Sequence, residues 1–207
     1  MTTPVRGEQY TLPDLLHEGL ALVFVGINPS LYSVAQGHYF ARKTNRFWPC
    51  FSRSVLSLPV RRALGVDVLL PVHDRILPDC GIGFTDVVKR ATANAAELGR
   101  DEFAAGAASL VARLKRYRPR VACFQGMMGY RPVAAVLGLA AGDATLGPQP
   151  SVLGETQVFV VPSPSPANAH FTPAQQTDWY DRLAAHIRTL APAAQSPAAA
   201  SGETPRR

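Results

Sequence analysis

The chain has 207 residues, of which 47% are hydrophobic and 17% charged, so it has the length and the apolar content for a folded domain. Its formal net charge of +6 favours polyanionic partners, but charge alone does not establish them. No apolar run is long enough to span a bilayer, and residues 1–16 lack the basic start and apolar centre of a secretory signal. We therefore expect a cytoplasmic protein with no membrane partner.

The three cysteines, Cys50, Cys80 and Cys123, lie far apart in the chain, with no CxxC pair and no histidine at metal-ligand spacing. We interpret them as reduced, mostly buried thiols. A zinc site or an iron–sulfur cluster needs more ligands than these residues supply, so the sequence predicts no metal and no cofactor.

The first clear element is a buried strand at 22–25, preceded by a flexible lead-in at 1–12 and a short helix predicted at 12–19. The apolar run of this strand breaks at Gly26-Ile27-Asn28-Pro29-Ser30, a sequence typical of a strand end. The Asn28 side chain is therefore expected at the carboxyl edge of a sheet, where open α/β sheets bind ligands.

Rings, cations and an amide are interleaved after this loop: Tyr39, Phe40, Arg42, Lys43, Asn45, Arg46, Phe47 and Trp48. An amide at a strand end, with flat rings and cations close behind, suits a flat heteroaromatic ligand that carries a phosphate. A helix is expected to begin within 45–51, the segment 60–67 is ambiguous, and 69–77 fits either a loop or a short helix.

A second informative stretch runs from Cys80 to Arg90 and contains Gly81-Ile82-Gly83-Phe84-Thr85-Asp86. Two glycines followed by Thr-Asp predict a tight turn that places Asp86 beside the same sheet edge. Asp86 could instead cap a helix that begins at Val87, and the residues alone leave both readings open.

Short apolar strands and helical patterns alternate in the rest of the chain. In order, we predict a helix at 101–117 with Asp101 as N-cap, a strand at 121–124, a helix at 130–137, a turn-rich segment at 142–154, a strand at 158–161, and a helix from Thr172 and Pro173 to about 190. This order predicts a three-layer α/β/α fold with a central, mostly parallel, short-stranded sheet. We expect one domain over 13–190 and a disordered tail over 191–207.

Four segments then support a family resemblance: Gly26-Ile27-Asn28-Pro29, Asn45-Arg46-Phe47-Trp48, Gly81 to Asp86, and Pro162-Ser163-Pro164-Ser165. In this order they resemble the mismatch-specific uracil/thymine DNA glycosylase family of the uracil-DNA glycosylase superfamily, over about residues 20–190. The resemblance implies hydrolysis of the N-glycosidic bond of uracil or thymine mispaired in double-stranded DNA, leaving an abasic site. It implies no metal and no covalent lysine intermediate. Single-stranded DNA is a further candidate substrate, and we expect a monomer that acts at the nucleoid.

The resemblance also assigns roles to residues. Asn28 matches the amide that positions the attacking water, Phe40 the aromatic ring that stacks on the extruded base, and Asn45 an asparagine near the base or its loop. Ile27 and Ser30, in the same loop as Asn28, are further candidates for base binding. The segment that matches the loop entering the minor groove contains Ser163, Pro164, Ser165, Pro166, Ala167 and Asn168.

Three positions depart from the family pattern. Ser30 stands where relatives usually have glycine, which would narrow or re-aim the pocket floor. Residues 166–169 offer only small side chains where relatives carry a Leu or Arg that plugs the duplex. Asp86 stands where relatives place a neutral amide or a lysine.

The chemistry of the reaction distinguishes Asn28 from Asp86. Positive charge develops on the sugar and negative charge on the leaving base, so backbone N–H groups of the 27–30 and 37–40 turns are candidate donors to the base anion. Neutral Asn28 can orient a water molecule but cannot take its proton, whereas an ionised Asp86 can do both. We therefore hypothesise that Asp86 shares or dominates water activation, and name Asn28 and Asp86 as catalytic.

Simpler readings remain for each feature. Asn28-Pro29 fits an ordinary turn, Phe47 and Trp48 fit the core, and Lys89, Arg90 and the cations of 113–120 fit a solvated face. A DNA-damage-binding module that has lost hydrolysis is the leading alternative function. Another kind of nucleotide-binding α/β protein is disfavoured, because neither a P-loop nor GxGxxG follows the first strand.

Overall fold

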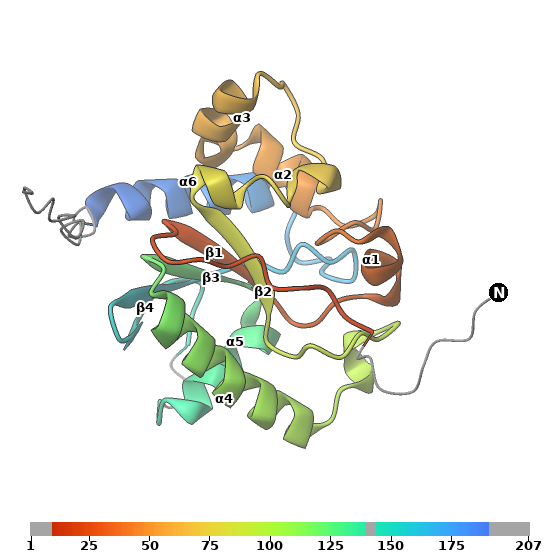
Figure 1. Ribbon diagram of the computed structural model, residues 1–207, viewed down its shortest axis with the longest axis vertical. Helices are drawn as coiled ribbons and strands as arrows, with labels where there is room; N and C mark the ends of the chain where they lie inside the picture. The colour runs from red at the N-terminus through yellow and green to blue at the C-terminus, as the bar shows by residue number, and fades with distance from the viewer. Residues whose placement is uncertain (1–9, 140–143, 191–207) are drawn as a thin grey trace, which may run out of the picture.

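Five strands form one sheet, in the order β2-β1-β3-β5-β4, in the computed structural model of the chain, which describes residues 10–139 and 144–190 (Figure 1). Strands β2, β1, β3 and β5 are parallel to their neighbours, and the edge strand β4 is antiparallel to β5. The bounds are β1 (Leu22–Gly26), β2 (Ile82–Asp86), β3 (Val121–Gln125), β4 (Gly147–Leu153) and β5 (Thr156–Val161). The predicted mostly parallel, short-stranded sheet is confirmed.

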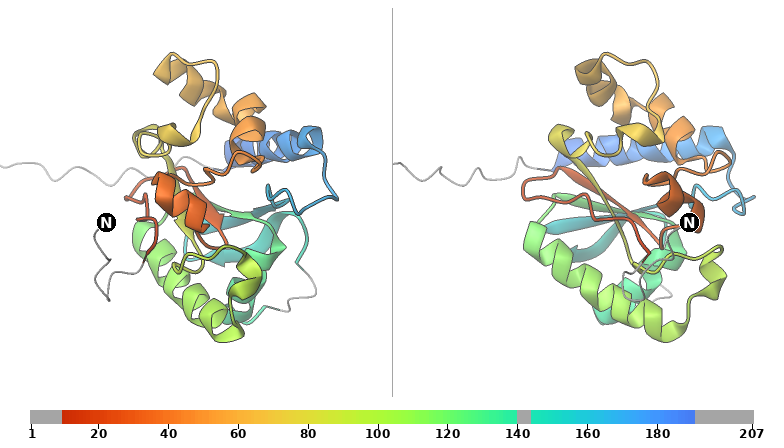
Figure 2. Two further views of the ribbon diagram at one scale, coloured as in Figure 1. Left: turned by 90° about the vertical axis from the view of Figure 1, so that its right-hand side faces the viewer. Right: turned by 45° about the vertical axis from the view of Figure 1, so that its right-hand side comes forward.

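Helices cover both faces of this sheet (Figures 1 and 2). Leu22 and Phe24 of β1 enter a core shared with α2 and α6, whereas Val23 and Val25 enter a second core shared with α4 and α5. This alternation arises because successive strand side chains point to opposite faces. The three-layer α/β/α prediction is therefore confirmed. The α-helices of the described residues are α1 (Leu31–Gln36), α2 (Phe47–Arg53), α3 (Leu58–Leu64), α4 (Arg100–Tyr117), α5 (Met127–Val136) and α6 (Pro173–Thr189).

The turn predicted over residues 81–86 is wrong, because this segment is strand β2. Its glycine serves a close approach instead of a turn: a Cβ on Gly83 would lie 2.5 Å from the backbone oxygen of Leu15. The helix predicted at 12–19 is also wrong. Leu15 pairs antiparallel with Phe84 along the outer edge of β2, so this segment is extended.

The other differences concern helix ends and an edge strand. No helix begins at Val87, so Asp86 is not an N-cap, and the N-cap of α4 is Gly99 instead of Asp101. The turn-rich segment contains the unpredicted strand β4, and the ambiguous segment 60–67 overlaps α3. Thr172 caps α6 as predicted: its hydroxyl accepts a hydrogen bond from the backbone N–H of Gln175.

Two predictions lie wholly or largely outside the described residues: the flexible lead-in at 1–12, of which only 10–12 are described, and the disordered tail at 191–207. In the part of the chain that is described, no helix combines the length and the apolar character needed to cross a bilayer. Cys50 and Cys123 are buried and Cys80 is partly exposed, all three as free thiols.

Candidate active site

A cavity of about 330 Å³ opens at the carboxyl edge of the sheet. Because β1, β2, β3 and β5 run parallel, the residues that end or follow these strands meet at this edge. Asn28, Asp86 and Phe40 all line the cavity, so the convergence expected from the sequence is present. Its volume lies in the usual range for small-molecule sites.

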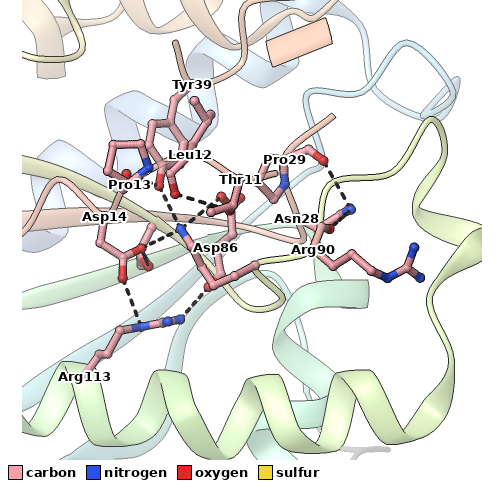
Figure 3. A network of polar contacts seen from close by, with 12 residues as sticks. Thr11, Leu12, Pro13, Asp14, Asn28, Pro29, Tyr39, Asp86, Arg90 and Arg113 are labelled. Atoms are coloured by element: carbon pink, nitrogen blue, oxygen red, sulfur yellow. Dashed lines mark hydrogen bonds and ion pairs between the residues drawn. The ribbon is translucent and has the colours of Figure 1, made fainter. Parts of the chain in front are cut away.

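The Asn28 side chain is held by the segment that follows β2 (Figure 3). Its Nδ2 donates to the carbonyl oxygen of Arg90 at 2.9 Å and to Oγ1 of Thr92 at 2.7 Å. A carbonyl oxygen only accepts, so the amide nitrogen must face Arg90 and the Oδ1 atom remains as a hydrogen-bond acceptor. Thr92 is itself fixed by backbone hydrogen bonds with Pro29 and Leu31. The Oδ1 atom of Asn28 is therefore preorganised to accept a hydrogen bond from a water molecule.

The Asp86 carboxylate lies beside the end of β1, where Gly26 is its partner in the strand register. A Cβ on Gly26 would lie 2.3 Å from Oδ1 of Asp86, so only glycine at position 26 leaves space for the carboxylate. Asp86 is 2% exposed, and its buried Oδ2 has no hydrogen-bond partner among the described residues. A buried polar atom without a partner requires an explanation, and a bound water or substrate supplies one.

Burial raises the pKa of Asp86 from 3.8 to about 7, because the charged carboxylate loses its hydration. The Lys89 ammonium, 4.0 Å from Oδ2, and the Arg113 guanidinium oppose this rise in pKa, whereas the negative charge of Asp14 adds to it. A carboxyl group with a pKa near the working pH is well suited to accept a proton from water and to release it again.

Phe40 has the left-handed backbone φ of +53°, which is unfavourable for a residue with a side chain. Its ring stacks on the buried ring of Phe47, with centroids 4.4 Å apart and planes at 24°. In the 37–40 turn, the N–H groups of Gly37, His38 and Tyr39 donate to protein acceptors, whereas that of Phe40 has no partner among the described residues. Of the backbone donors predicted in this turn, Phe40 is therefore the one that remains for a ligand.

Asn45, Ser30 and Ile27 also line the cavity, but two of them have local roles as well. Oδ1 of Asn45 accepts the backbone N–H of Phe47, which leaves the Nδ2 atom of Asn45 to donate. Ser30 is the N-cap of α1: its Oγ accepts the backbone N–H of Ser33 and donates to the Ser33 hydroxyl. The Ser30 hydroxyl is therefore largely committed to the helix.

The predicted DNA-binding loop forms another wall of the cavity. Residues 163–167 line it, and Pro166 and Ala167 are exposed at the tip. Asn168 does not line the cavity: its Nδ2 donates to the carbonyl oxygen of Ser163 at 2.9 Å and so braces the loop from within.

Several residues of this site are not among the predicted site residues. Gln125 lines the cavity at the end of β3, and a polar residue directly after a predicted strand was the available signal. Lys89 and Arg113 were expected on a solvated face, which is wrong: each is about four-fifths buried and ion-paired with Asp14. Nothing in the sequence around Asp14 indicated that it approaches Asp86.

A comparison with known protein families adds an independent observation to this geometry. The family described as the uracil DNA glycosylase superfamily matches residues 13–185. The match includes every residue of the cavity named above.

Proposed function

The chain belongs to the uracil DNA glycosylase superfamily, and on that premise we propose that it hydrolyses the N-glycosidic bond of uracil mispaired with guanine in duplex DNA. Membership itself indicates a hydrolase that acts on N-glycosyl bonds in DNA. The finer proposal is a monofunctional enzyme that extrudes the mispaired base into the cavity and leaves an abasic site. The observation that carries it is that Asn28, Asp86 and Phe40 line the same cavity.

The proposed reaction follows from what each group can accept or donate. A water molecule bound between Asn28 Oδ1 and Asp86 forms a bond from its oxygen to C1′ of the sugar and gives a proton to the carboxylate. The bond between C1′ and the base breaks, and its electron pair leaves with the base. In this proposal the N–H of Phe40 donates to the base anion, and the ring of Phe40 stacks on the base, a contact worth about 1–3 kcal/mol.

A panel of labelled oligonucleotides tests this function. Purified protein is incubated with duplexes that carry uracil or thymine opposite guanine or adenine, and with single-stranded uracil, and abasic sites are revealed by alkaline cleavage. We expect the fastest cleavage for uracil opposite guanine. Tight binding to that duplex with no cleavage of any substrate would instead favour a DNA-damage-binding module, to which the small side chains at the loop tip also point.

Replacing Gly26 by alanine tests the position of Asp86 without changing its charge. The new methyl group would overlap Oδ1 of Asp86, so we expect the carboxylate to move and the rate of uracil release to fall at least about tenfold. The matched control is Gly99→Ala, because a Cβ there meets no atom closer than 3.7 Å. Equal rates for the two variants in single-turnover assays would contradict the prediction.

A further inference from the structure

The amino-terminal segment places a second carboxylate beside Asp86. Leu15 donates its N–H to the carbonyl oxygen of Phe84 at 2.9 Å and accepts the Phe84 N–H at 3.1 Å. This pairing fixes the register between the segment and β2, so that Asp14 lies next to Thr85, whose hydroxyl donates to Oδ1 of Asp14 at 2.7 Å. Asp14 is therefore held by strand-like pairing and not by a free loop.

Asp14 forms ion pairs with both cations that face Asp86, and Figure 3 shows the pair with Arg113. The Lys89 ammonium lies 2.8 Å from Oδ1 of Asp14 but 4.0 Å from Oδ2 of Asp86. The Arg113 guanidinium lies 3.5 Å from Oδ2 of Asp14, and it reaches Asp86 only at the backbone oxygen, at 2.7 Å. Neither cation makes a hydrogen bond to the Asp86 carboxylate.

We propose that Asp14 is a positioning residue that holds Lys89 and Arg113 away from the Asp86 carboxylate and so keeps that carboxylate free to accept a proton from water. This inference rests on the proposed function, because it assumes that Asp86 is the base. It assigns Asp14, which lies beyond the cavity wall, to the reaction through its effect on two neighbours.

The argument is one of competing ion pairs. A carboxylate in a direct ion pair with lysine or arginine is stabilised in its charged form and becomes a weaker base. Tyr39 is a further titratable group near Asp86; its hydroxyl lies 3.4 Å from the Lys89 ammonium, and its raised pKa keeps it neutral. With Asp14 neutralised, Lys89 would have Asp86 as its nearest remaining carboxylate, and the pKa of Asp86 would fall.

Two variants with opposite expected effects test this proposal. Asp14→Asn should move the acid limb of the pH–rate profile for uracil release to lower pH by about one unit or more, and lower the plateau rate. Lys89→Met should move the same limb to higher pH. Glu18→Gln is the control, because Glu18 lies in the same segment but its carboxylate is ion-paired with Arg118, at 3.9 Å, and not with Lys89 or Arg113 among the described residues.

A readout that does not need activity separates this proposal from the function itself. The ¹³C resonance of the Asp86 carboxyl, titrated by NMR, should show the same two opposite shifts. Opposite NMR shifts in a protein that releases no uracil would support the effect of Asp14 on the two cations and overturn the proposed hydrolysis. An unmoved Asp86 titration in Asp14→Asn, with activity lowered equally at every pH, would overturn the proposal, because Asp14 would then be merely structural.

Discussion

Replacing Asp86 by asparagine is expected to lower the rate of uracil release about 10²–10⁴-fold. Asparagine fills the same space beside Gly26 but cannot take a proton from water. The wild-type rate should rise through an apparent pKa near 7 as the carboxylate ionises, so the comparison is made at pH 8 in single-turnover assays on a labelled duplex with uracil opposite guanine. An Asp86→Asn variant with full activity would eliminate Asp86 as the base.

The same variant is expected to lose activity but to gain stability at alkaline pH. Because the pKa of Asp86 is raised from 3.8 to about 7 in the folded state, burying the charge destabilises the fold fully above pH 7, and this cost disappears as the pH falls towards 4. The free energy of unfolding of Asp86→Asn should therefore exceed that of wild type by at most ~4 kcal/mol at pH 8, with no such gain at pH 4. Denaturant unfolding at the two pH values measures this difference. Asn28→Ala is the control, since it should lower release without this pH-dependent gain.

Residues with strong local signals could be placed from the sequence. The strands β1, β3 and β5 are continuous apolar runs, as expected for parallel strands buried on both faces, and α6 begins with a Thr-Pro pair that caps and starts a helix. Asn28 can be placed at the sheet edge because it follows a buried strand. The sequence also predicts Asp86 at that edge, but through a turn, whereas Asp86 is the last residue of strand β2.

Residues whose position depends on distant pairing could not be placed. The glycine of β2 resembles a turn signal because its real function, close contact with Leu15, involves a segment about 70 residues away in the chain. The location of Asp14 depends on that same pairing. Lys89 and Arg113 follow patterns that usually indicate a solvated surface, and only the fold shows that both turn inward towards Asp14.

Arg46 clamps the loop that is proposed to enter DNA. Its guanidinium donates to the carbonyl oxygens of Phe171, Ser165 and Asn168, and its backbone N–H donates to that of Pro164 at 2.9 Å. The loop tip has only small side chains, so it cannot displace a base by bulk. The proposed entry of the loop into the duplex then depends on a fixed backbone shape, and the hydrogen bonds of Arg46 fix that shape.

We therefore expect Arg46→Met to lower uracil release from duplex DNA about 10²-fold, but to affect single-stranded uracil much less, because no base has to be displaced there. The free energy of unfolding should also fall by about 3 kcal/mol, since hydrogen bonds to a charged group are lost. Arg46 is the N-cap of helix α2, and Arg53→Met, at the exposed other end of that helix, is the control for loss of an arginine. Equal losses on the two substrates, in a variant that is still folded, would mean that the clamped loop holds the base itself and does not open the duplex.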